Sequence, residues 1–218
     1  RISNIDIPFL ITLFDFKIFS TIFVLLCFLF IINGANLIDG FNGLLVINVI
    51  IINIVLTYIN INSANYEFSF FLISQIIILL SFLLFNFPSA KIFLGDSGAY
   101  LLGSLIVLNT IITNNLNPNI SSFFFCTLLF YIFFEVFFSF FRKIYLRRSP
   151  LKPDGDHMHM LLYNYLKKSQ KFEDCNYLNS LTINLVYLSL ILPSIFFNDN
   201  GLICKYWFFS LIALYIVF

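Results

Sequence analysis

Residues 21–59 read TIFVLLCFLFIINGANLIDGFNGLLVINVIIINIVLTYI, two long apolar runs on either side of a short polar break. The runs at 17–35 and 44–60 each come close to the roughly 20 apolar residues that a helix needs to cross a bilayer. The break contains one acid, Asp39, among asparagines and glycines, which favour turns. This pattern predicts two membrane-spanning helices joined by a polar turn at a membrane surface.

The rest of the 218-residue chain has the same character. It is 60% hydrophobic and only 11% charged, whereas about a quarter of the residues in a soluble domain are charged. Apolar runs near spanning length recur at 17–35, 44–60, 68–86, 98–113, 122–142, 178–197 and 203–218. We therefore expect an all-α, polytopic integral membrane helical bundle with about seven transmembrane helices, forming a single domain over residues 1–218.

The positions of lysine and arginine predict how the bundle is oriented. Eight of the twelve basic residues lie in segment 142–177, and short cytoplasmic loops carry such an excess. Counting spans back from this segment places the loops near 36–43, 87–97 and 143–177 on the cytoplasmic face. We expect a multi-pass protein of the cell (inner) membrane whose unusual polar motifs all share this face.

The first motif is NGANLIDGFNGLL, residues 33–45. Asn33, Asn36, Asp39 and Asn42 recur every third residue, so neighbouring pairs lie close together on a helix or a 3₁₀ turn. The glycines between them permit tight turns and the close approach of a ligand. Two interpretations stay open, a ligand site around Asp39 or a polar helix end capped by Asn and Asp side chains.

The second motif is FNFPSAKIFLGDSGAYLLG, residues 85–103. It places Lys91 and Asp96 in a loop, followed by small residues at four-residue spacing from Gly95 to Gly103, which let helices pack closely. Asp96 either caps the helix that follows or presents a carboxylate at the inner mouth of the bundle. In the second case Lys91 lies nearby to bind phosphate oxygens.

The third motif is RKIYLRRSPLKPDGDHMHMLL, residues 142–162. Arg147 and Arg148 help to make this loop attractive to anions, although basic residues beside a span also serve as a topology signal and contact anionic lipids. His157 and His159 are one residue apart, yet no third strong ligand lies at a spacing typical of zinc sites. We expect the two histidines to bind ligand phosphates, with zinc as the alternative.

Two further features involve ionisable or reactive side chains. Glu135 lies inside the apolar run 122–142, where an ionisable group is a functional candidate by default and a structural bond to a neighbouring helix is the alternative. The four cysteines have no metal-ligand spacing, so we expect them to be packing residues.

These residue types favour one kind of chemistry. Carboxylates that face basic and imidazole groups at a membrane surface suit Mg²⁺, which takes one or two protein carboxylates, substrate phosphate oxygens and several waters. Phosphoryl transfer depends mainly on positioning and on charge neutralisation, and a metal surrounded by Lys, Arg and His supplies both. The sequence therefore favours a phosphoryl transferase.

Taken in order and on one face, the three motifs resemble those of the polyprenyl-phosphate N-acetylhexosamine-1-phosphate transferases, which include the undecaprenyl-phosphate N-acetylglucosaminyl-1-phosphate transferases. Phospho-N-acetylmuramoyl-pentapeptide transferase is similar in the first two motifs. The resemblance covers nearly the whole chain. It implies transfer of a sugar-1-phosphate from a UDP-N-acetylhexosamine to undecaprenyl or another polyprenyl phosphate, with release of UMP, at the start of cell-envelope glycan synthesis (O-antigen, capsule or peptidoglycan-like).

The resemblance also implies residue roles. Asn36 and Asp39 match the family's N-x-x-D-G element, Asp96 matches the metal-binding aspartate of G-D-[ST]-G, and the two histidines match its His-rich loop. We expect Asp39 and Asp96 to be catalytic residues and metal ligands, with Mg²⁺ as cofactor and Mn²⁺ as an alternative. The residues expected to bind substrate are Asn36, Asn42, Lys91, Arg147, Arg148, His157 and His159. The expected partners are the two substrates, the bilayer and a second copy in a homodimer, and not nucleic acid.

Three departures from the family pattern leave alternatives open. Asn42 stands where many members have a second aspartate, and Met160 stands where many have a third histidine. The D-D-x-x-D motif expected upstream of the first span is absent, so we expect the sequence to be the C-terminal part of a longer catalytic domain. A catalytically impaired family member is one alternative. A polytopic transporter is the other. Transport predicts ionisable groups at the bilayer midplane and an internal repeat, whereas this sequence concentrates its ionisable groups at one surface and shows no repeat.

Overall fold

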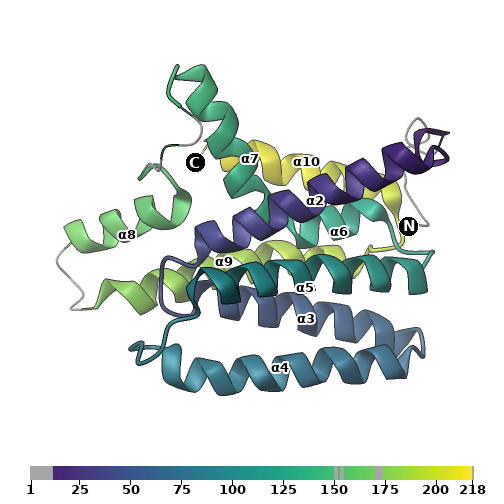
Figure 1. Cartoon of the computed structure of the whole chain (residues 1–218), viewed down its shortest axis with the longest axis horizontal. Helices are drawn as coiled ribbons and strands as arrows, with labels where there is room; N and C mark the ends of the chain where they lie inside the picture. The colour runs from purple at the N-terminus through teal and green to yellow at the C-terminus, as the bar shows by residue number, and fades with distance from the viewer. Residues whose placement is uncertain (1–11, 150–151, 153–154, 170–173, 218) are drawn as a thin grey trace.

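The computed structural model describes residues 12–149, 152, 155–169 and 174–217, and the elements in this part of the chain are helices (Figure 1). They are α2 (Lys17–Ile38), α3 (Leu44–Asn62), α4 (Tyr66–Asn86), α5 (Gly95–Leu116), α6 (Ser122–Leu128), α7 (Phe130–Tyr145), α8 (Met158–Lys168), α9 (Cys175–Ile195) and α10 (Gly201–Val217). Five of them, α2 to α5 and α9, are long and apolar enough to cross a membrane. The prediction of an all-α, polytopic membrane bundle is confirmed.

One apolar run does not form a continuous helix. α6 and α7 meet at Leu129 with a bend of 76°, so together they make a broken span or a re-entrant segment. The run at 122–142 therefore does not form the one continuous helix that the sequence predicted. The Tyr187 hydroxyl of α9 donates to the carbonyl of Leu128, and a side chain that bonds into the helical hydrogen-bond ladder is a known cause of kinks. Figure 1 shows α7 leaving the common direction of the other long helices.

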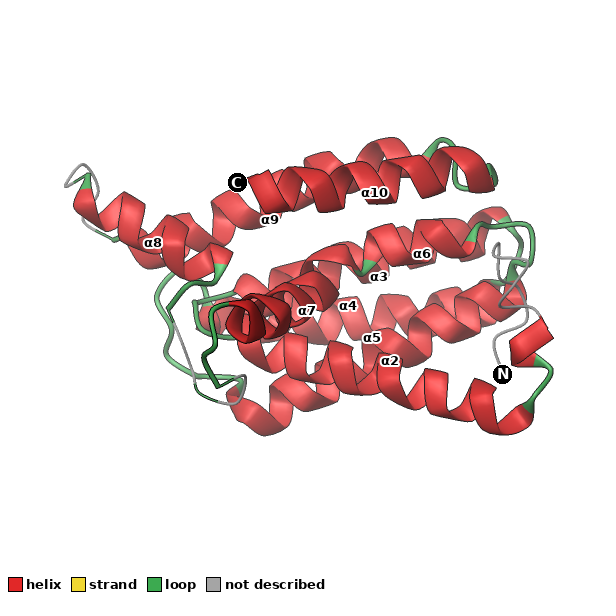
Figure 2. Cartoon of the chain, turned by 90° about the horizontal axis from the view of Figure 1, so that it is seen from above, coloured by secondary structure: helices red, strands yellow, loops and turns green. Residues whose placement is uncertain are grey.

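The three polar motifs meet at one end of the bundle, at the left of Figure 1. The C-terminal ends of α2 and α4 lie there with the N-terminal ends of α3, α5 and α9, and α8 lies beside them. Seen from above, α9 and α10 form one side of the bundle and α2 and α5 the other (Figure 2). At the opposite end Ser121 N–H donates to the carbonyl of Asn198 at 2.8 Å and joins the two loops there. The alternation of loops between the two ends agrees with the sequence prediction.

Amide side chains bond to one another inside the bundle. The Asn109 amide donates to Asn53 Oδ1 at 3.1 Å and to Gln75 Oε1 at 2.8 Å, and Asn53 donates to Gln75 Oε1 at 3.2 Å. These three residues belong to α5, α3 and α4, so the cluster ties three apolar helices together. Hydrogen bonds of this kind contribute to helix association where lipid supplies no hydrophobic driving force.

Two glycines let α2 approach its neighbours closely. A Cβ added at Gly34 would lie 2.2 Å from the carbonyl oxygen of Ile132 in α7, and one added at Gly103 of α5 would lie 2.8 Å from Ile32 Cα. The predicted close packing at Gly103 is confirmed. Gly95 has a different role, because an added Cβ there meets open space and its φ of +68° requires the left-handed region.

Gly34→Ala is expected to destabilise the bundle, because the new methyl group overlaps a backbone carbonyl that cannot move independently. Overpacking of this kind costs about 1–3 kcal/mol. The matched control is Gly40→Ala, since a Cβ at Gly40 has nothing within 4 Å. Thermal unfolding in detergent should show a lower melting temperature for Gly34→Ala only, and equal melting temperatures for both variants would contradict the packing account.

Candidate active site

The turn between α2 and α3 is bonded to the second motif. The Asn42 side-chain amide donates to the carbonyl of Pro88 at 2.9 Å, and Gly43 N–H donates to Asn86 Oδ1 at 2.7 Å. Asn86 is the last residue of α4, and its own amide donates to the carbonyl of Ile92 at 2.8 Å. One asparagine therefore holds the turn after α2 and the loop before α5 in a fixed relation.

The same turn contacts the third motif and α9. The ring of Phe41 packs edge-on against His159 with centroids 5.8 Å apart, and it also lies 5.1 Å from the ring of Tyr163. Asn42 N–H donates to Asn176 Oδ1 of α9 at 2.8 Å. The three motifs are therefore in physical contact through a few residues, as their placement on one face predicted.

The α2–α3 turn, the loop before α5 and the start of α9 meet at a junction, and Asp39 and Asp96 are two carboxylates there. Asp39 directly follows α2 and is partly buried, whereas Asp96 lies exposed in the first turn of α5. Burial raises the pKa of Asp39 to about 6, and the negative charge of Asp96 adds to the rise. The two side chains are thus close enough for their charges to repel.

Helix capping does not account for Asp39. Asp39 lies at the C-terminal end of α2, where the helix dipole disfavours a negative charge. The helix that follows, α3, has Gly43 as its N-cap and no side-chain cap bond. Asp96 in the first turn of α5 does suit the helix dipole, although the N-cap of α5 is Leu94 and makes no side-chain bond either. Helix stability therefore accounts for Asp96 but not for Asp39. A ligand is the better explanation for the carboxylate of Asp39.

The repulsion between these carboxylates fits a divalent cation. Among the residues that the structure describes, no group of three or more His, Cys, Asp or Glu side chains could hold a metal ion. A cation bound by Asp39 and Asp96 would need few protein ligands if substrate oxygens and water completed its coordination. Mg²⁺ binds in this manner, through one or two carboxylates together with substrate phosphates.

The raised pKa of Asp39 predicts a change in stability with pH. Ionisation of Asp39 is harder in the folded than in the unfolded protein, so its contribution to stability is fully present below about pH 4 and is lost as pH rises through about 6. Asp39→Asn should therefore raise the melting temperature of the metal-free protein at pH 8 and change it little at pH 4. An equal shift at both pH values would contradict this electrostatic account.

Glu135 is almost completely buried, with 1% of its surface exposed, and it faces the histidine loop. Its Oε2 lies 3.1 Å from His157 Nδ1, and its Oε1 accepts from Met158 N–H at 3.2 Å. His157 and His159 are themselves only 4% and 2% exposed. The two rings are stacked with centroids 5.5 Å apart. Of the two interpretations of Glu135, the structure supports a bond to another part of the chain, and that part is the third motif.

His159 is a neutral residue in this setting. Burial lowers its pKa to about 4, with the charge of Glu135 opposing the shift and His157 adding to it. The 3.9 Å separation between His159 Nδ1 and Glu135 Oε1 is therefore not an ion pair at neutral pH. The Tyr131 hydroxyl lies 3.5 Å from the same nitrogen. His159 packs as an uncharged ring between the first and third motifs.

The basic residues of the third motif lie at the end of α7. Arg142 donates to the carbonyl of Asp156, and Lys143 Nζ donates to the carbonyl of Lys152 at 2.8 Å. Arg148 pairs with Asp156 at 3.3 Å, and both side chains are exposed, where such a pair contributes little to stability. Arg147 is exposed with φ of 55°. Asp154, which the sequence places with this charge cluster, lies outside the described residues.

Three other residues expected to bind substrate lie near the junction in different ways. Asn36 donates to the Tyr100 hydroxyl at 3.3 Å and so links α2 to α5. Asn42 uses its side chain to hold Pro88 and is therefore partly structural. Lys91 has an exposed side chain in the loop before α5.

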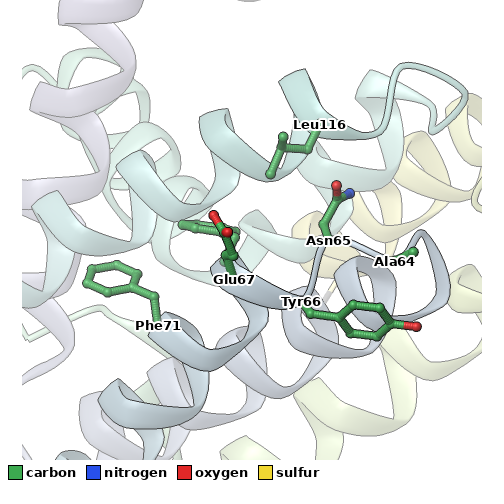
Figure 3. Close-up of a pocket in the computed structure, with 7 residues that line it drawn as sticks. Ala64, Asn65, Tyr66, Glu67, Phe71 and Leu116 are labelled. Carbon is green, nitrogen blue, oxygen red and sulfur yellow. The ribbon is translucent and has the colours of Figure 1, made fainter.

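A pocket of about 600 Å³ lies elsewhere in the molecule (Figure 3). It is lined by residues of the α3–α4 turn, the start of α4 and the end of α5, among them Asn65, Glu67 and Leu116. The 19 residues of α3, Leu44–Asn62, separate the first motif from this turn by about 28 Å at 1.5 Å per residue. The pocket is therefore at the opposite end of the bundle. It does not belong to the carboxylate site.

Three residues at the junction were not singled out from the sequence. Asn86 and Asn176 bond backbone N–H groups of the first turn, and Tyr100 bonds Asn36. Tyr100 follows Asp96 by one helical turn, so its position on the same face of α5 was a usable signal. Asn86 and Asn176 resemble the chain's many other asparagines, and nothing in their local sequence distinguishes them.

Comparison with known proteins identifies relatives of this chain. Undecaprenyl-phosphate alpha-N-acetylglucosaminyl 1-phosphate transferase of Thermotoga maritima is 28% identical over 210 residues, which are 95% of this chain and 58% of that protein. Phospho-N-acetylmuramoyl-pentapeptide-transferase of Leuconostoc mesenteroides is 39% identical over 108 residues, 50% of this chain and 33% of that protein. The enzyme with the same name from Clostridium perfringens is 32% identical over 110 residues, 50% of this chain and 35% of that protein.

The chain thus spans a little over half the length of the first relative and about a third of the others. The sequence model of a protein family described as glycosyl transferase family 4 matches residues 1–114, which include the first two motifs. This match covers more than half of the 218 residues. The chain therefore belongs to glycosyl transferase family 4.

Proposed function

We propose that this protein transfers a sugar-1-phosphate of the N-acetylhexosamine type from a UDP-sugar to a polyprenyl phosphate such as undecaprenyl phosphate. An oxygen of the lipid phosphate attacks the β-phosphorus of the UDP-sugar. The bond between that phosphorus and the oxygen bridging to the α-phosphate breaks, and UMP leaves with this oxygen. The product is a lipid pyrophosphate that carries the sugar, and no water is consumed.

The meeting of the three motifs around the Asp39–Asp96 pair is the observation that carries this proposal. The pair lies at an end of a membrane bundle, where a lipid phosphate and a water-soluble nucleotide can both reach it. The mutual repulsion of the two carboxylates favours a cation between two anionic substrates. The names of the relatives point to the same reaction, since one acts on undecaprenyl phosphate.

In this proposal Asp39 and Asp96 hold Mg²⁺, or Mn²⁺ in its place. The bound cation neutralises phosphate charge and orients the reacting groups. Asp39 and Asp96 are the catalytic residues, and Asn36 and Lys91 contact substrate beside them. Arg147 and Arg148 lie past the end of α7. In this proposal their positive charges attract the nucleotide from a distance and do not contact it directly. The positive charge of the third motif supports a position of this end of the bundle at the cytoplasmic face of the cell membrane.

A reconstituted assay tests the proposal. The protein expressed from its complete reading frame would be incubated with Mg²⁺, undecaprenyl phosphate and, separately, UDP-N-acetylglucosamine, UDP-N-acetylgalactosamine or UDP-glucose. We expect UMP release with an N-acetylhexosamine donor, and only when both the lipid and the metal are present. UMP release at the same rate without lipid would contradict the proposal, and the preferred donor would identify the sugar.

Alanine at His157 or His159 is expected to weaken UDP-sugar binding by about tenfold, because a charge-assisted bond to phosphate contributes about 1.5–3 kcal/mol. The Michaelis constant for the UDP-sugar should rise more than that for the lipid. Tyr165→Ala is a control in the same helix, since this side chain is exposed. A rise in the lipid constant alone would contradict nucleotide binding by the histidines.

A further inference from the structure

We propose that Tyr100 and Asn36 together bind the phosphate group of the polyprenyl phosphate, and that the Tyr100 hydroxyl is the donor that recognises this group. Tyr100 lies on α5 and Asn36 on α2, and both side chains are uncharged amide or phenol groups. This inference rests on the proposed function and deepens it, because it assigns one of the two substrates to one part of the site.

Asn36 holds the Tyr100 hydroxyl by a bond that leaves the hydroxyl proton available. The Asn36 side-chain amide donates to the Tyr100 hydroxyl oxygen at 3.3 Å. A tyrosine hydroxyl has one proton to donate, and an asparagine amide nitrogen has two. Within the described part of the chain, neither side chain makes a further hydrogen bond. The pair therefore presents two hydrogen-bond donors that come from two different helices.

A ligand can reach this pair from outside the bundle. Tyr100 is 41% exposed, and Asn36 is only partly buried. Ser104, one turn further along α5, donates its own proton to the carbonyl of Tyr100 at 2.8 Å. Exposed residues further into the membrane on the same two helices, such as Leu29 and Leu108, are apolar. Such a surface suits a phosphate that is attached to a hydrocarbon chain.

The pair lies about one helical turn deeper in the membrane than the two carboxylates. α2 ends at the junction, and Asn36 precedes Asp39 by three residues. α5 begins at the same end of the bundle, and Tyr100 follows Asp96 by four residues (Figure 1). At 1.5 Å per residue these separations are about 4.5 and 6 Å along the helices. The site therefore has charged carboxylates toward the loops and uncharged donors toward the bilayer interior.

These two levels correspond to the two substrates of the proposed reaction. In phosphoryl transfer the attacking and the leaving oxygens lie on opposite sides of the phosphorus, roughly in line. The positive charges of the third motif lie on the loop side of the carboxylates and attract the nucleotide there. The leaving UMP is then on the loop side, and the attacking lipid phosphate approaches from the bilayer side. Asn36 and Tyr100 lie on that side.

Binding of the lipid in the absence of nucleotide tests the inference directly. The full-length protein in detergent would be titrated with undecaprenyl phosphate, and the rise in its melting temperature gives the dissociation constant. Tyr100→Phe removes only the hydroxyl and should raise this constant about 10–100-fold, because a hydrogen bond to a charged group has about this effect. Undecaprenol has no phosphate, so the substitution should leave its binding unchanged.

Two controls belong to this titration. Tyr206→Phe makes the same chemical change at a tyrosine that is 71% exposed near the start of α10, at the opposite end of the bundle, and it should not alter lipid binding. Inorganic phosphate replaces the lipid in a parallel titration and should leave the melting temperature unchanged. Stabilisation by inorganic phosphate that disappears in Tyr100→Phe would mean that the pair binds a water-soluble anion, which would overturn the assignment to the lipid.

Kinetics test whether the same contact operates during the reaction. In Tyr100→Phe the Michaelis constant for undecaprenyl phosphate should rise about 10–100-fold, and the constant for the UDP-sugar should change less than threefold. Asn36→Ala removes the group that holds the hydroxyl. The double variant should lose less lipid affinity than the product of the two single losses, because residues in one hydrogen-bond network are not additive.

The outcomes separate this inference from the proposed function. Unchanged lipid affinity in Tyr100→Phe would overturn the inference even in an active transferase, and so would a rise confined to the UDP-sugar constant. Independent losses in the double variant would overturn the joint role of Asn36 and Tyr100. Hydroxyl-dependent binding of undecaprenyl phosphate by a protein that transfers no sugar-1-phosphate would support the binding site and contradict the proposed function.

Discussion

Asp96→Asn is expected to lower the turnover number by about a thousandfold or more while the protein stays folded. Asparagine removes the negative charge that holds the cation, and the loss of one preorganised electrostatic contact alone costs about 100–1,000-fold. Asp96 is exposed in the first turn of α5 and makes no helix-cap bond, so the substitution leaves the packing intact. The measurement is the rate of UMP release at saturating substrates over a range of Mg²⁺ concentrations.

The control for this variant is its melting temperature, which should stay within a few degrees of that of the unsubstituted protein. Burial is the main cause of the raised pKa of Asp39, and Asp96→Asn also removes the second, smaller cause, the charge of Asp96. The pKa of Asp39 in the metal-free variant should therefore fall by a part of its shift, while burial still keeps it above its usual range. Near-normal turnover at all Mg²⁺ concentrations would show that Asp96 does not hold the metal.

Asp39→Asn is expected to reduce turnover by about a hundredfold or more, for the same electrostatic reason. The informative comparison is with Asn42→Ala, three residues along the same turn. Asn42 carries no charge, and its side chain donates to the carbonyl of Pro88, so its loss should cost about 1 kcal/mol of stability and less than tenfold in turnover. Equal, small losses in both variants would mean that this turn has only a structural role.

Asp39→Asn should combine lower activity with higher stability at pH 8. A residue that only stabilises the fold cannot show this combination, because its removal lowers both quantities. A loss of activity together with a gain in stability would mark Asp39 as a group that the fold holds in an unfavourable state because it binds a ligand, as functional residues often do.

Hydropathy and periodicity were sufficient to predict most of the fold. The bounds of α2 to α5 and α9 lie within a few residues of the predicted runs, because a bilayer requires long, uninterrupted apolar helices. The break at Leu129 could not be predicted, since the local sequence there contains neither Gly nor Pro. At this point Tyr187 donates to the carbonyl of Leu128 from 59 residues away. Such a contact has no signature in a single sequence.

The candidate site was partly predictable. The location of Asp39 and Asp96 at one end of the bundle follows from counting spans, and the charge coupling between them is consistent with it. The burial of His157 and His159 does not follow from a loop rich in charge and proline. It depends on Glu135 and on Phe41 packing from two other parts of the chain. Asn42 similarly has a bond to Pro88 that its motif position alone did not suggest.

The central claim is that the β-phosphate and the sugar move together from the nucleotide to the lipid. UDP-N-acetylglucosamine labelled with ³²P at the β-phosphate, or the donor preferred in the assay above, tests this claim most directly. The full-length protein with Mg²⁺ and undecaprenyl phosphate should move the label into the lipid fraction in a one-to-one ratio with UMP formed. Label that remains in water as a sugar phosphate or inorganic phosphate while UMP accumulates would contradict the claim, because the enzyme would then be a hydrolase.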